Sequence, residues 1–273
     1  MRRSSILGLV CWAALLTPAW LQAASSSQTE VFLESMTSAE VAAAVRAGRT
    51  TIIIPVGGTE QSGPHLALGK HNVRVHYLAG KIASALGNAL VAPVVSYVPE
   101  GAISPPSGHM RFAGTISIPD GAFQTLLEAA GRSFKQHGFR DIVLLGDHGG
   151  YQAQLRDVVA RLNRAWAGSA TRAHFIADYY SAAQTEFPKL LRAQGLSEEQ
   201  IGLHGGSADT SLTLAIHPSL VRTDQFGTAA QGGVGVGVEG DPRPSTAILG
   251  QAGVDLIVQR SVAAIRRAVA AAR

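Results

Sequence analysis

Apolar runs typical of buried strands alternate with helix-like stretches from residue 50 onward, and this order constrains the fold more than any other feature. The run 50–56 is rich in β-branched residues and ends at Gly57-Gly58, while the run 142–145 ends at the turn 146–150. Such alternation favours a three-layer α/β/α sandwich, with a mostly parallel sheet between two helix layers. A length of 273 residues favours one large domain over two small ones.

Local signals place the other elements. Thr37 and Glu40 have the spacing of a capping box, which predicts a helix that runs on to Arg46. Further helices are predicted near 73–86, 122–137, 152–166 and 254–271, and further strands near 90–97, 115–118 and 174–177. The Gly-rich stretch 232–240 alternates with Val and fits either a loop or a strand.

Residues 1–23 have the layout of a secretory signal peptide. Arg2 and Arg3 precede an apolar run at 6–16, and Ala23 is a small residue at the expected cleavage site. The run is shorter than the roughly 20 apolar residues of a transmembrane helix, so no stable membrane anchor is expected. We predict export, to the periplasm, of a mature domain over residues 24–273.

Export would leave the mature chain without a thiol. Cys11 is the single cysteine of the sequence and lies in the predicted signal peptide. Disulfides and cysteine-ligated metals are therefore excluded, and the chemistry falls to His, carboxylates and hydroxyls. Loss of two arginines also lowers the formal net charge from +4 to +2. Because the basic residues are scattered, no nucleic-acid partner is expected.

Three polar clusters lie at 60–71, 146–150 and 204–211. The first two directly follow predicted strands, and the third precedes a predicted helix. Ligands of open parallel sheets bind outside the carboxyl ends of the strands, where the loops converge. The clusters are therefore candidates for a functional site.

These clusters resemble the motifs of the creatininase (creatinine amidohydrolase) family. The family's Glu-Gln-His-Gly-x-His-Leu-Pro motif, with an Asp a few residues on, is similar to Glu60-Gln61-Ser62-Gly63-Pro64-His65-Leu66-Ala67 and His71. Its Asn-Gly-His-Gly-Gly-Asn motif resembles Gly146-Asp147-His148-Gly149-Gly150-Tyr151. Its His-Ala-Gly-Glu-x-Glu-Thr-Ser motif resembles His204-Gly205-Gly206-Ser207-Ala208-Asp209-Thr210-Ser211.

The resemblance implies a creatininase-like fold and a homo-oligomer, commonly a hexamer. It also implies metal-dependent hydrolysis of a C–N bond in a cyclic or linear amide other than a peptide, with two divalent ions held by Glu, His and Asp. This chain departs from the pattern, because Ser62 replaces a ligand His, His71 replaces the bridging Asp and Asp209 shortens a Glu. Gly150 stands where some members carry an acid. The losses fall mostly on one ion position, so one ion is expected rather than two, or else one strongly and one weakly bound ion.

Glu60, His71 and His148 remain as the predicted metal ligands. Three protein ligands with an open fourth position are typical of catalytic Zn²⁺, and imidazole with carboxylate also suits Mn²⁺ or Fe²⁺. The alternatives are a solvated loop carboxylate for Glu60 and a surface histidine for His71. Asp147 fits a ligand, a partner that orients His148, or a helix cap.

His204 and Asp209 are the predicted catalytic residues, because an imidazole can protonate a leaving amine and an acid can activate water. A loop-fixing hydrogen bond is the alternative for His204, and a helix cap is the alternative for Asp209. His65 and His109 are predicted to fix loops. A Ser62 nucleophile is disfavoured, since its surroundings lack a nucleophile elbow.

Two functions compete. The first is a metal-dependent amidohydrolase that acts on a small-molecule amide. The second is a non-catalytic small-molecule-binding protein that kept this scaffold with a degenerate metal site. The retained Glu60, His148, His204 and Asp209 favour the enzyme.

Overall fold

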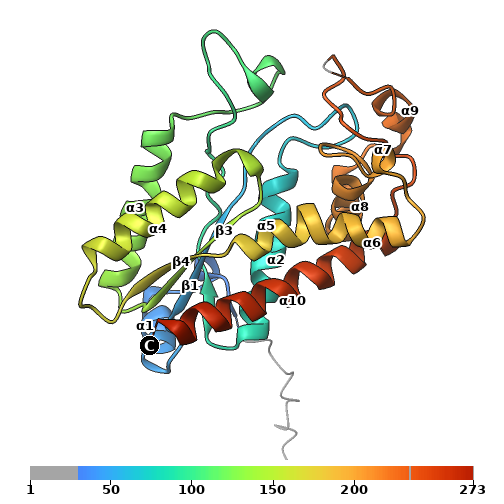
Figure 1. Ribbon diagram of the computed structural model, residues 1–273. Coiled ribbons are helices and arrows are strands. Elements are labelled where there is room, and N and C mark those ends of the chain that lie inside the picture. The colour runs from blue at the N-terminus through green and yellow to red at the C-terminus, as the bar shows by residue number, and fades with distance from the viewer. Residues whose placement is uncertain (1–29, 234, 273) are drawn as a thin grey trace, which may run out of the picture. The chain divides into compact units, whose positions relative to one another are not determined.

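A parallel sheet lies at the centre of the computed structural model, which describes residues 30–233 and 235–272 (Figure 1). In the described part of the chain the strand order is β2-β1-β3-β4, with β1 at Thr51–Val56, β2 at Ala89–Val91, β3 at Asp141–Gly146 and β4 at Arg172–Phe175. Thr51 pairs with Asp141 and Val56 with Gly146, so β1 and β3 end together. Every residue of both strands is buried, as expected for the centre of a parallel sheet.

Helices cover both faces of the sheet. Ile52 and Ile54 pack against one layer, whereas the alternate residue Ile53 packs against the other. The first layer holds α1 (Ser38–Arg46), α3 (Asp120–Gln136) and α4 (Gln152–Ala165). The second holds α2 (Lys70–Leu86), α5 (Ala177–Ser181), α6 (Phe187–Ala193), α8 (Ser207–Ile216) and α10 (Ala247–Ala271). The three-layer α/β/α prediction is confirmed.

Several boundaries differ from the sequence-based expectation. The strand expected near 90–97 stops at Val91, two residues before Pro93, which cannot donate a ladder hydrogen bond. Residues 115–118 bond to loop carbonyls instead of a ladder, since Ile116 donates to Thr59 and Ile118 donates to Val98. The capping box at Thr37 is present as predicted. The remaining α-helices of the described residues are the short α7 (Glu198–Ile201) and α9 (Phe226–Ala229).

Helix α10 begins at Ala247, seven residues before the predicted start at 254, with Thr246 as its cap. Among the described residues it is the one helix long and apolar enough to cross a membrane, with a mean hydropathy of 1.2. Its glycines pack tightly into the protein, because a Cβ on Gly250 would lie 1.8 Å from the Ser211 carbonyl oxygen of α8. The helix therefore belongs to the core.

Loops at the carboxyl ends of β1 and β3 position the polar clusters. The Tyr151 hydroxyl ties these loops together, since it accepts from the backbone N–H of Asp147 and of His148 and donates to the Gly57 carbonyl. Tyr151 is fully buried. The predicted signal peptide, 1–23, lies outside the described residues.

Candidate metal centre

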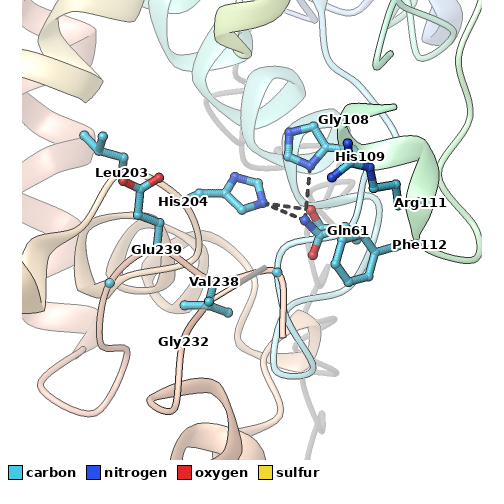
Figure 2. A pocket seen from close by; sticks show the side chains of 13 residues that line it. Gln61, Gly108, His109, Arg111, Phe112, Leu203, His204, Gly232, Val238 and Glu239 are labelled. Atoms are coloured by element: carbon cyan, nitrogen blue, oxygen red, sulfur yellow. Dashed lines mark hydrogen bonds between the residues drawn. The ribbon is translucent and has the colours of Figure 1, made fainter. Parts of the chain in front are cut away.

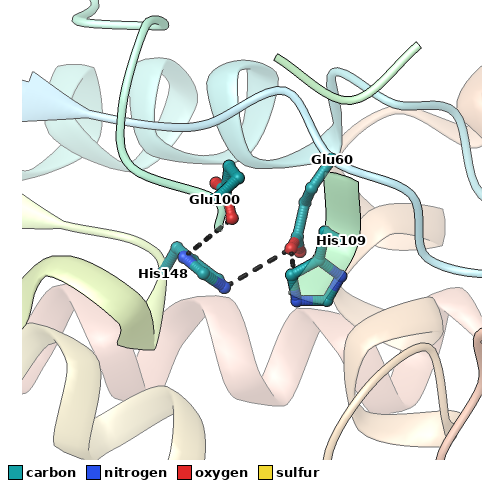
Figure 3. Close-up of side chains that lie close together, drawn as sticks. All are labelled: Glu60, Glu100, His109 and His148. Atoms are coloured by element: carbon teal, nitrogen blue, oxygen red, sulfur yellow. Dashed lines mark ion pairs between the residues drawn. The ribbon is translucent and has the colours of Figure 1, made fainter. Parts of the chain in front are cut away.

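Four side chains from the connections that follow β1, β2 and β3 converge beside the sheet (Figure 3). Glu60, Glu100, His109 and His148 each offer a ligand atom, and these atoms all lie within 4.8 Å of one another. Glu60 Oε2 lies 3.1 Å from His109 Nε2 and 3.4 Å from His148 Nε2. Glu100 Oε2 lies 3.4 Å from His148 Nδ1. We call this group the metal cluster.

The carboxylates of the metal cluster have buried oxygens without hydrogen-bond partners. Glu60 Oε2 and both oxygens of Glu100 accept no hydrogen bond, although both side chains are fully buried. Burial and the nearby Glu60 charge raise the pKa of Glu100 to about 9. Buried polar atoms are almost always satisfied, and a carboxylate can be satisfied by a cation. Two carboxylates and two imidazoles fit a Zn²⁺ or Mn²⁺ ion.

His148 is a neutral imidazole in this setting. Burial lowers the pKa of His148 to about 3. Neutral imidazole is the form that coordinates metals. A Cβ at residue 150 would lie 2.9 Å from His148 Cε1, so the ring fills the space next to Gly150.

His71 lies outside the metal cluster. Its Nε2 is 2.7 Å from Glu60 Oε1 and 2.6 Å from Lys70 Nζ, and its Nδ1 is 2.6 Å from Asp147 Oδ2. Both ring nitrogens are therefore engaged by other side chains. The structure brings Glu60 and His148 together as predicted, but it places His71 behind Glu60, where it orients that carboxylate.

Asp209 is paired with two buried cations. Its carboxylate lies 2.6 Å from Arg74 Nη1 and 3.3 Å from Lys70 Nζ. Although burial opposes it, these two charges hold the pKa of Asp209 well below its usual range. The cap of α8 is Gly206, and Asp209 lies in the first helical turn with a bond from the Gly205 N–H. Asp209 therefore does not cap α8, and its role in proton transfer stays a prediction.

Asp147 contacts residues other than His148, the partner that the sequence suggested. It bonds to His71 and Arg74 on one oxygen and accepts from the Tyr179 hydroxyl at 2.6 Å on the other. It neither caps a helix nor contacts the His148 ring among the described interactions.

His204 lies on the wall of a pocket of about 580 Å³ next to the metal cluster (Figure 2). Its Nδ1 is 3.9 Å from Glu60 Oε1, and its ring centroid is 4.7 Å from that of His109. Its Nε2 donates to the Gln61 carbonyl at 2.9 Å, which leaves the lone pair on Nδ1. The other lining residues include Arg111, Phe112, Leu203, Val238 and Glu239.

Two members of the metal cluster, Glu100 and His109, were not predicted as metal ligands. Glu100 stands in an irregular loop and matches no quoted motif, so no signal marked it. His109 makes the loop-fixing contact that was predicted, because its Nδ1 lies 3.1 Å from Gln61 Nε2, and its Nε2 also faces Glu60 at 3.1 Å. His65 has the loop-fixing contact that was predicted, 2.9 Å from the Thr210 hydroxyl.

Comparison with known proteins decides the family. The creatininase family profile, described as creatinine amidohydrolase, matches residues 34–265. The chain belongs to the creatininase family. It is 32% identical over 228 residues to a mycofactocin precursor peptide peptidase of Mycobacterium ulcerans, covering 74% of this chain and 78% of that protein. It is 28% identical over 202 residues to a creatinine amidohydrolase of Pseudomonas putida, covering 71% and 75%.

Solved creatininase structures share the fold. A manganese creatininase and a Zn–Zn form of a creatininase mutant each match with a TM-score of 0.70 at 24% identity, covering 87% of this chain and 98% of theirs. This creatininase-family protein is therefore a hydrolase with a candidate metal-binding cluster. A peptidase among the relatives means that family membership does not restrict the substrate to non-peptide amides.

Proposed function

We propose that the protein is a metal-dependent amidohydrolase that hydrolyses a C–N bond in a small cyclic or linear amide. The single observation on which this rests is the metal cluster, with its buried carboxylate oxygens that lack hydrogen-bond partners. Glu60, Glu100, His109 and His148 would hold one divalent ion, with zinc and manganese ahead of iron. This set keeps two of the ligands expected from the sequence and replaces His71 with Glu100 and His109.

When bound, a divalent ion supplies Lewis-acid polarisation of the amide carbonyl and activates water. The pocket, which Phe112, Val238 and His204 line, would admit the substrate beside the metal cluster. Burial lowers the pKa of His204, which keeps the ring neutral. A neutral ring with its lone pair on Nδ1 can take a proton from the attacking water and return it to the leaving nitrogen.

We expect purified protein to hold one zinc or manganese ion per chain. Elemental analysis after dialysis against micromolar Zn²⁺ or Mn²⁺ measures this, because the metal cluster has donors for one ion. A chain that binds no ion, and gains no hydrolase activity from either metal, would contradict the proposed function.

The substrate is identified by a panel of cyclic amides, linear amides and short peptides assayed with the metal-loaded protein. Turnover of cyclic or small linear amides supports the non-peptide class, whereas turnover of peptides alone places the protein with its peptidase relative. A compound that raises the melting temperature but is never hydrolysed favours the binding-protein alternative.

His204→Gln is expected to lower kcat about a hundredfold with little change in bound metal, because it removes the proton carrier and leaves the metal cluster intact. A steady-state assay together with metal analysis checks this. The control is His217→Gln, because His217 is exposed, follows the carboxyl end of α8 and does not line the pocket. Equal activities of the two variants would argue against proton transfer by His204.

Export to the periplasm and assembly into a homo-oligomer, with a hexamer as the first candidate, complete the proposal. Export is supported by the layout of residues 1–23 alone. Oligomerisation is supported by the family resemblance alone.

A further inference from the structure

We propose that the Lys70 ammonium group fills a second cation site beside the metal cluster, and that this site accepts a divalent ion when the ammonium is removed. The site consists of Glu60, His71 and Asp209. The inference rests on the proposed function in one respect, namely that Glu60 also serves the metal cluster.

The surroundings of Lys70 are those of a cation-binding site. Its Nζ lies 3.2 Å from Glu60 Oε1, 3.3 Å from Asp209 Oδ2 and 2.6 Å from His71 Nε2. Two carboxylate oxygens and an imidazole nitrogen are a donor set that suits Zn²⁺ or Mn²⁺. The donors come from the loop after β1, from α2 and from α8, so the fold, rather than one flexible segment, fixes them.

Lys70 is buried more completely than a lysine in a surface salt bridge. Its side chain has 0% exposure, and lysine is almost never fully buried unless it is paired. Here the ammonium sits at the first residue of α2, directly behind Glu60.

Glu60 is shared between the two cation sites. Its Oε1 faces Lys70 and His71, while its Oε2 faces His109 and His148 in the metal cluster. The arrangement places one fixed positive charge on one side of the carboxylate and donors for one ion on the other. Lys70 therefore restricts the parent chain to one divalent ion and holds Glu60 in position before that ion binds.

The test compares Lys70→Ala with Lys70→Met. Alanine empties the second site, whereas methionine fills a similar space without charge and with only a weakly coordinating thioether. Zn²⁺ or Mn²⁺ per chain is measured by equilibrium dialysis and elemental analysis at increasing free metal. We expect one ion in the parent, two in Lys70→Ala and one in Lys70→Met. Adding Asp209→Asn to Lys70→Ala should lower the affinity for the second ion by at least about tenfold.

Thermal unfolding gives an independent readout. Millimolar metal should raise the melting temperature of Lys70→Ala beyond the increase seen for the parent, because the second ion binds the folded state. The same metal should give Lys70→Met no increase beyond that of the parent.

Several results would overturn the inference. They are two ions in the parent at saturating metal, one ion in a folded Lys70→Ala chain, or a Lys70→Ala chain that stays unfolded in millimolar metal. A parent that binds no ion refutes the proposed function instead. In that case a single ion gained by Lys70→Ala would still support the second site.

Discussion

Glu60→Gln should lose its bound metal and lower hydrolase activity by about a thousandfold or more, since loss of a metal's Lewis-acid contribution amounts to several kcal/mol in the barrier. The substitution conserves shape but removes the charge shared between Lys70 and the metal cluster. It also turns one carboxylate oxygen into an NH₂ group, which presents hydrogens either to the ammonium or to the metal. Among the members of the metal cluster, Glu60 is the one whose substitution would affect both the contact with Lys70 and the binding of the ion.

The matched control is Glu239→Gln. Glu239 lines the pocket of His204 but is exposed and does not belong to the metal cluster. We expect it to keep one ion per chain and activity within a few-fold of the parent. Metal content, kcat and the circular dichroism spectrum are measured for both variants. A folded Glu60→Gln chain with full metal content would show that the ion binds elsewhere.

The sequence predicted the layers of the fold well, because the signals for them are local. The β-branched run in β1 and the capping box at Thr37 depend on neighbours in the chain, and both appear in the structure. Some boundary predictions were wrong. β2 ends at Val91, two residues before Pro93, whereas the strand expected at 115–118 is absent because Ile116 and Ile118 donate to carbonyls of distant loops.

Site residues could be predicted where a family motif directly follows the end of a strand. Glu60 and His148 follow β1 and β3, whose common register brings them together. Glu100 and His109 come from a long loop without periodicity, so only the folded chain shows that they face Glu60. His71 shows the opposite case. Its position in the motif suggested a ligand, but its neighbours Lys70, Arg74 and Asp147 already occupy both ring nitrogens.

Charge compensation inside the protein explains why those neighbours could not be foreseen. Lys70 and Arg74 look like surface residues at the start of an amphipathic helix, yet both are buried. The partners of Arg74, Asp147 and Asp209, lie more than 70 residues further along the chain, and Lys70 also contacts Asp209 in addition to the nearby Glu60. A buried cation with such distant partners leaves no local pattern in the sequence.

Arg74→Met should destabilise the fold by about 3–5 kcal/mol, the usual cost of removing one partner from a buried ion pair. Arg74 donates to Asp147 at 2.8 Å and to Asp209 at 2.6 Å, and its side chain is 2% exposed. Those two carboxylates raise the pKa of Arg74 further, despite its burial. Methionine fills a similar volume, so the loss reports the uncompensated carboxylates more than a cavity. For a domain of this size the melting temperature should fall by about 6–20 °C.

Arg243→Met is the control, because Arg243 also binds a carboxylate with several nitrogens but does so in solvent. Its guanidinium contacts both oxygens of Asp241, and its side chain is 66% exposed. Exposed pairs contribute about 0–1 kcal/mol, so the free energy of unfolding should change little. Urea denaturation of both variants measures the difference. Equal losses would mean that the network behind Glu60 is solvated, and the fixed position of Lys70 would then lack its physical basis.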